Sequence, residues 1–182
     1  MINTFHVIAQ KGFEGLRLRE VAARAGIDHS TLHHHFPTKA DLVAAVLDYA
    51  SEQFRRRRGP DDGSPTTIQE HLGFLAEMIV ESPELHTVLR EFDLHGRRDK
   101  RVRAMIVRSE KGWRDRLAVR MQKARAEGEF AIEFDPVIGA ELVIAVVKGA
   151  SFNPKATPGT MRLFERMLHQ KGTNRRRGKR QS

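Results

Sequence analysis

The sequence has 182 residues (20.7 kDa), enough for one compact unit that buries roughly 70% of its unfolded surface. It contains no cysteine, which excludes disulfides, thiolate metal sites and cysteine nucleophiles. The longest uninterrupted apolar run, Leu142–Val147, is far shorter than the roughly 18 residues of a membrane span. Because Met1 is not followed by a basic and then apolar leader, we expect a soluble, cytoplasmic protein without a signal peptide.

The net charge of +9 is concentrated at the two ends of the chain. Residues 1–58 carry +3, residues 59–169 carry no net charge, and residues 170–182 carry +6. Basic ends around a neutral body fit a polyanionic partner, with nucleic acid first. A solvated basic tail alone would produce much of the same number.

Apolar residues recur at helical spacing, and alternating strand patterns with hairpin dipeptides are missing, so the sequence predicts an all-α fold. In chain order, the expected helices of the first half are residues 2–12, 18–26, 28–36 and 38–58. A linker rich in glycine and proline follows at residues 59–65.

Longer helices are expected in the second half, and most begin or end at recognisable signals. They are residues 66–82, a helix that begins at Pro83, residues 99–127, residues 136–148 with Asp135 as N-cap, and residues 159–171. Residues 172–182 are predicted to be a disordered basic tail.

The segment Leu16–Phe36 has the pattern of two short helices joined by a tight turn. Gly26 can adopt the positive φ that reverses the chain, and Asp28 can cap the next helix by accepting from Ser30 or Thr31. With Leu32 and Phe36 pointing inward, short or planar polar side chains remain outside, namely His29, Ser30, His33 and His34. A helix that reads bases in the major groove needs such a face near its N-terminus.

The next helix begins with a variant of the capping box formed by Thr38 and Asp41. Lys39 lies in its first turn, where a cation opposes the helix dipole. This placement is favourable if a phosphate binds there.

Together these residues resemble the tetracycline-repressor (TetR) family of bacterial regulators. The resemblance rests on Gly12–Gly15, Val21-Ala22, Ala25–Ile27, Thr31-Leu32 and His34–Leu42. It implies a nine-helix, all-α homodimer with a helix-turn-helix DNA-binding domain at residues 1–48, a helical ligand-binding and dimerisation domain at 49–171, and the tail at 172–182. It further implies a palindromic operator and release by an unknown small-molecule inducer, with repression expected rather than activation.

The resemblance also assigns candidate DNA contacts. These are Arg17, Arg19, His29, Ser30, Thr31, His33, His34 and Lys39. Two positions depart from the family pattern: Arg17 replaces the usual Ser or Thr cap, and His33 replaces the common Tyr. His35 is expected to be a structural residue beside Phe36.

Two further sets follow from apolar residues of the helical domain. The candidate ligand contacts are Phe74, Met78, Phe92, Met105 and Trp113. The candidate dimer contacts are Ile138, Leu142, Val143, Val146, Met161, Phe164, Met167 and Leu168.

Other classes of function remain as alternatives. One is a helical carrier or enzyme with a purely structural N-terminal region, and another is a sequence-indifferent DNA-coating protein that binds through its tail. His29 and His33 have the i, i+4 spacing of zinc ligands, but no further ligand is evident. We therefore expect neither a metal nor a cofactor, and no catalytic constellation is found, so the chain is not expected to be an enzyme.

Overall fold

A computed structural model describes residues 1–57, 67–130 and 134–169. Within these ranges the chain forms nine α-helices and no strand, as predicted. The helices are α1 (Ile2–Lys11), α2 (Leu18–Ala25), α3 (His29–His35), α4 (Lys39–Arg57), α5 (Ile68–Glu81), α6 (Pro83–Gly96), α7 (Lys100–Ala126), α8 (Pro136–Ala150) and α9 (Thr157–His169). The expected linker at 59–65 and the tail at 172–182 lie outside the described residues.

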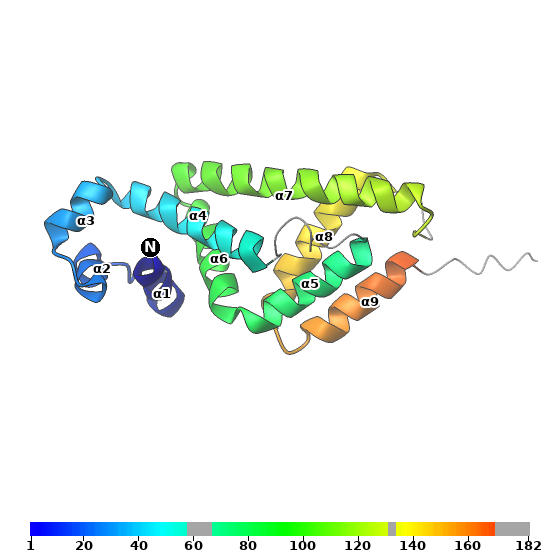
Figure 1. Cartoon of the computed structure of the whole chain (residues 1–182), viewed down its shortest axis with the longest axis horizontal. Coiled ribbons are helices and arrows are strands. Elements are labelled where there is room, and N and C mark those ends of the chain that lie inside the picture. The colour runs from blue at the N-terminus through cyan, green and yellow to red at the C-terminus, as the bar shows by residue number, and fades with distance from the viewer. Residues whose placement is uncertain (58–66, 131–133, 170–182) are drawn as a thin grey trace, which may run out of the picture.

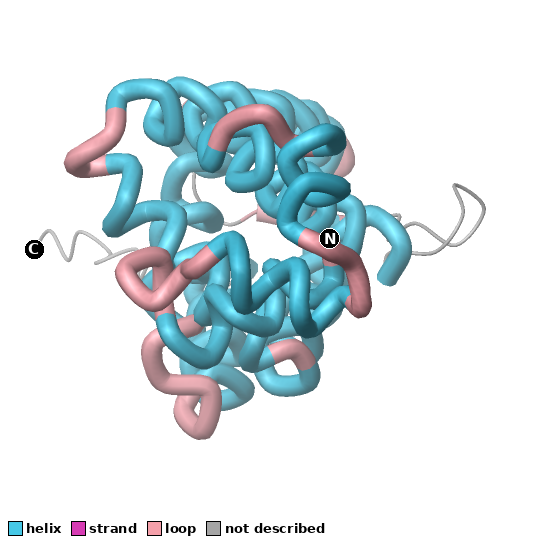
Figure 2. The backbone as a smooth tube through the Cα atoms, turned by 90° about the vertical axis from the view of Figure 1, so that its left-hand side faces the viewer, coloured by secondary structure: helices cyan, strands magenta, loops and turns pink. Residues whose placement is uncertain are grey.

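The molecule is elongated, and α1, α2 and α3 lie at one end of it (Figure 1). α4 leads from α3 toward the other helices, and α7 runs along one long side. Figure 2 views the same arrangement end-on and shows helices joined by short loops. None of the helices in the described ranges has a stretch that is long and apolar enough to cross a membrane.

The start of the last helix differs from the prediction. α9 begins at Thr157 rather than at Gly159, because the Thr157 hydroxyl donates to the carbonyls of Ala150 (3.0 Å) and Asn153 (3.1 Å) and ties the turn to α8. Pro158 fits here because the first turn of a helix has no internal partner for its N–H groups.

Two hydrophobic clusters hold the helices together. The first joins the N-terminal helices to α4 and α6 through residues such as Ile8, Leu32 and Val88. The second joins α5, α7, α8 and α9. Because α6 belongs to the first cluster, α1, α2 and α3 share a core with a helix from the second half of the chain.

Candidate DNA-binding and ligand-binding sites

A single carboxylate organises the N-terminus of α3. Oδ1 of Asp28 accepts from the backbone N–H groups of Ser30 (3.0 Å) and Thr31 (3.2 Å), which confirms the predicted cap. Gly26 adopts φ 68° and ψ 24°, the left-handed conformation expected of the turn. These two residues set the angle between α2 and α3.

The hydroxyl groups of Ser30 and Thr31 also donate to Asp28. These hydrogen bonds hold the pKa of the Asp28 carboxyl below its usual value, and the bond from the Ser30 hydroxyl contributes most. Both hydroxyl groups, which the sequence assigned to DNA, therefore already have a partner in the cap, and each would have to exchange it to reach a phosphate or a base.

The outward face of α3 consists of imidazoles. His29, His33 and His34 are exposed, while Leu32 is buried in the first cluster. The rings of His29 and His33 lie 6.4 Å apart between centroids. His35, expected to be structural, is exposed as well, and its ring meets that of His34 edge-on. The sequence signal that could have placed His35 outside is its position in a seven-residue helix whose single apolar residue is Leu32.

The arginines at the start of α2 point into solvent. Arg17 is the N-cap residue but makes no side-chain cap bond, and its guanidinium donates instead to the carbonyl of Glu14 (2.6 Å). Arg19 is exposed.

The N-terminus of α4, which follows α3, carries the next predicted DNA contact. Oγ1 of Thr38 accepts from the N–H of Asp41 (3.1 Å), and the Asp41 carboxylate accepts from the N–H of Thr38 (2.9 Å), which confirms the predicted capping box. Lys39 is exposed in the first turn of α4.

The turn between α1 and α2 docks onto α6. The Phe13 ring packs edge-on against Phe92 (5.0 Å between centroids) and stacks on His95 (4.6 Å). The N–H of Phe13 donates to the Glu91 carboxylate at 3.1 Å. This contact connects the helix-turn-helix directly to a helix that borders the cavity described next.

A cavity of about 160 Å³ lies among α4, α6, α7 and α8. Apolar and aromatic side chains, including Leu47, Ile106 and Trp113, form most of its wall. Phe92 lines this cavity on one side and meets Phe13 on another. Its remaining lining is polar and comes largely from charged residues.

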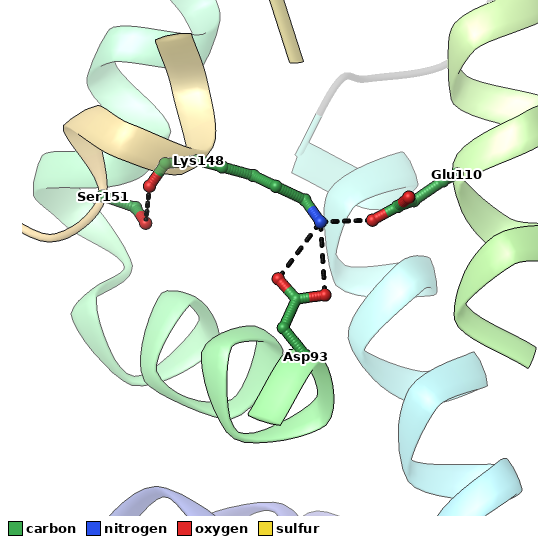
Figure 3. A network of polar contacts seen from close by, with 4 residues as sticks. All are labelled: Asp93, Glu110, Lys148 and Ser151. Carbon is green, nitrogen blue, oxygen red and sulfur yellow. Dashed lines mark hydrogen bonds and ion pairs between the residues drawn. The ribbon is translucent and has the colours of Figure 1, made fainter. Parts of the chain in front are cut away.

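The charged part of the cavity wall centres on Lys148 of α8 (Figure 3). Its Nζ contacts both carboxylate oxygens of Asp93 on α6 (3.1 and 3.2 Å) and also the carboxylate of Glu110 on α7. Burial alone would lower the pKa of Lys148, but the hydrogen bond to Glu110 and the charge of Asp93 outweigh it and raise the pKa. The sequence alone does not predict this cluster, because its members are 17 to 55 positions apart and carry no motif.

A buried histidine borders the same space. His86 of α6 is 4% exposed, and burial followed by the charge of Arg90 lowers its pKa to about 4, against a hydrogen bond to the Met78 backbone. At neutral pH the imidazole is therefore uncharged.

The structure brings together only two of the five predicted ligand contacts. Phe92 and Trp113 line the cavity, whereas Phe74, Met78 and Met105 pack into the hydrophobic clusters away from its lining. Helical periodicity shows that a residue faces inward, but it does not show whether that interior is packed or hollow.

The predicted dimer contacts divide in the same way. Ile138, Leu142 and Met167 are exposed apolar residues on α8 and α9. Val146 is half-buried, and four others are buried in the core of the single chain: Val143, Met161, Phe164 and Leu168. Two exposed residues that the prediction omitted, Val137 and Leu163, extend the apolar surface.

Sequence comparison connects this geometry to known proteins. Residues 3–46 match the family model for bacterial regulatory proteins of the tetR family. The chain is 37% identical over 51 residues to the transcriptional regulator CymR of Pseudomonas putida, covering 28% of this chain and 25% of CymR. It is 23% identical over 148 residues to the regulator UidR of Escherichia coli, covering 79% and 73% of the two chains.

Solved structures share the fold along nearly the whole chain. A TetR-family transcriptional regulator from Rhodococcus superposes with a TM-score of 0.76 at 24% identity, over 92% of this chain and 95% of the other. FadR of Bacillus subtilis, solved in complex with stearoyl-CoA, gives 0.75 at 17% identity over 92% and 97%. Residues 3–46 therefore match the helix-turn-helix region of the tetR family, and the chain as a whole is similar in fold to solved TetR-family transcriptional regulators.

Proposed function

We propose that this regulator binds a palindromic operator as a homodimer, acts as a repressor, and leaves the DNA when a small molecule occupies the cavity of the helical domain. The observation that carries the proposal is the exposed imidazole face of α3, held by the Asp28 cap at one end of the molecule.

The DNA contacts would come from three places around α3. His29, His33 and His34, joined by His35, would read base edges, since their rings are exposed and can donate or accept hydrogen bonds. Arg17 and Arg19 at the start of α2 would bind phosphate. The N-terminus of α4 with Lys39 would hold a further phosphate, since the helix dipole and the ammonium both favour an anion.

Dimerisation would use the exposed apolar surface of α8 and α9. Its members are Val137, Ile138, Leu142, Leu163 and Met167. Two copies of this helix pair would form a four-helix interface with twofold symmetry. Two copies of α3 could then enter successive major grooves roughly 34–36 Å apart.

The cavity would bind the inducer. It combines aromatic walls with the charged cluster of Asp93, Glu110 and Lys148, as expected of a site for a small molecule with an apolar body and a polar group. FadR, which shares the fold, was solved with stearoyl-CoA. That ligand is much larger than a space of about 160 Å³, so we infer a smaller inducer or a cavity that widens on binding.

Release of DNA would follow from contacts that the cavity shares with the helix-turn-helix. Leu47 of α4 and Phe92 of α6 line the cavity, and both belong to the core that packs against the N-terminal helices. A ligand that moves either helix changes the separation of the two α3 helices. Its effect is limited by its differential affinity for the two dimer states.

Selection of bound sites from random duplex DNA tests the proposal. We expect the purified protein to select a palindromic consensus sequence. Screening of small molecules by thermal shift can then identify the ligand. A carrier or enzyme with a structural N-terminal region would yield no enriched site. A sequence-indifferent DNA-coating protein would bind with a steep salt dependence but would yield no consensus.

A further inference from the structure

Positive charge gathers on the outward face of α7. This helix contains ten lysine and arginine residues and only two acidic ones, Glu110 and Asp115. Glu110 turns inward to Lys148, and Asp115 pairs with Lys111 at 2.7 Å. The net charge of residues 59–169 is therefore zero only because acidic residues elsewhere in this range cancel the positive charge of α7.

The apolar stripe of α7 is buried, which leaves the basic side chains outside. Val102, Leu117 and Met121 are no more than 1% exposed. The exposed basic residues include Arg101, Arg103, Arg108, Arg116, Lys123 and Arg125. We call this exposed surface the basic face of α7.

Much of this charge is not neutralised by the rest of the described chain. Within the described ranges, no acidic side chain forms an ion pair with Arg103, Arg108 or Arg116. Like charges three residues apart, such as Arg108 and Lys111, also destabilise a helix. An anionic partner would remove this repulsion.

The shape of the basic face favours duplex DNA over other polyanions. α7 has 27 residues and extends about 40 Å, and a duplex presents one negative charge per about 1.7 Å along a comparably straight axis. A membrane-binding helix needs large apolar side chains beside its charges, but the large apolar residues exposed on α7 are only Val107 and Val119. Single-stranded RNA needs exposed aromatic rings, and the one aromatic residue of α7, Trp113, lines the cavity.

We propose that the basic face of α7 binds the phosphate backbone of a second DNA duplex, separate from the duplex read by α3. The proposal rests on the proposed function, since it takes α3 as the operator-binding helix. α3 lies at one end of the molecule, whereas α7 runs along its long side (Figure 1). DNA is stiff over roughly 150 bp, so a duplex seated across α3 does not turn to follow α7.

A two-duplex titration tests this proposal. The full chain is saturated with unlabelled operator duplex, and a labelled duplex of unrelated sequence is then titrated at several salt concentrations with anisotropy as readout. We expect capture of the second duplex, with an affinity that falls steeply with salt. In the double variant Arg101→Ala, Arg108→Ala, the slope of log K against log salt should shrink by about 2, with operator affinity unchanged.

The matched control is Lys155→Ala, Arg162→Ala, which removes the same charge from exposed positions outside α7 and should leave the slope unchanged. Absence of capture by the wild-type chain, an equal loss in both double variants, or undiminished capture in the α7 variant would each overturn the proposal. So would tighter capture of single-stranded RNA or of phosphatidylserine vesicles. Failure of the proposed function can be distinguished from failure of this proposal, because the selection from random duplex DNA would then yield no operator sequence.

Discussion

At the residue scale, one acidic side chain holds the first turn of α3, the helix that we propose reads DNA. α3 has only seven residues and buries only Leu32, so packing contributes little to holding it in place. The Asp28 carboxylate satisfies two N–H groups and two hydroxyl groups of its first turn. Position and orientation of the imidazoles therefore depend on this cap.

We expect Asp28→Ala to lower both thermal stability and operator affinity at pH 7, and Asp28→Asn to preserve both because Asn also caps helices. The pKa of Asp28 is lowered from 3.8, so the stability it contributes is present above pH 3.8 and is lost as the pH falls through the lower folded value. Thermal unfolding at pH 7 and pH 3 checks this. A wild-type advantage over the Ala variant that stays constant across this range would contradict it.

The histidines of α3 lead to a second prediction, on pH and DNA binding. Histidine gains its charge between pH 8 and 5, and the charged form is favoured beside phosphates. We expect operator affinity to rise as the pH falls from about 8 to 6, by at most tenfold per pH unit for each proton taken up. His33→Gln should flatten the profile, whereas His6→Gln on α1 should not. A flat wild-type profile would count against the prediction.

At the element scale, the sequence predicted the helices well because their ends carry local signals. Asp28 and Asp135 each cap a helix as expected, and Asp99, expected as the first residue of the long helix 99–127, is the N-cap of α7. The predicted start of α9 was wrong by two residues, because the hydrogen bond from the Thr157 hydroxyl to the Ala150 carbonyl is a tertiary contact. The cavity was only partly predicted for a similar reason, since its charged wall joins α6, α7 and α8 and exists only once they pack.

That charged wall yields a third prediction. We expect Lys148→Met to lower the free energy of unfolding by about 1 kcal/mol, because it leaves Asp93 and Glu110 facing each other without a cation, while partial exposure screens the effect. The raised pKa of Lys148 means that its contribution is present below pH 10.5 and is lost as the pH rises through the higher folded value. Urea unfolding at pH 7 and pH 11 measures both effects.

Two variants control the Lys148 measurement. Lys111→Met breaks an exposed pair with Asp115 and should cost only about 0.3–0.5 kcal/mol. The double variant Lys148→Met, Glu110→Gln should recover part of the loss, since one carboxylate then loses its charge. If the double variant is less stable than Lys148→Met alone, repulsion between the carboxylates is not the cause.

At the scale of the whole molecule, charge and apolar surface are separated. Acidic residues elsewhere in residues 59–169 balance the basic charge of α7 in number but not in position, which composition alone does not reveal. Periodicity correctly indicated that α8 is apolar on more than one side, yet it did not distinguish the side that packs within the chain. Val143 and Leu142 are neighbours in sequence, but only Leu142 reaches the surface.

The last prediction concerns the proposed dimer. Ile138 is 61% exposed and Leu163 50% exposed, and a glutamate at either position would place a charge inside an apolar interface. We expect Ile138→Glu and Leu163→Glu to sediment as monomers of 20.7 kDa. Both variants should also lose affinity for the full operator, because each monomer then binds its half-site without the help of a second subunit. Val119→Glu on α7, where the valine is 68% exposed, is the matched control and should sediment as wild type does. A dimer that persists in both interface variants would mean that the two subunits meet through a different surface.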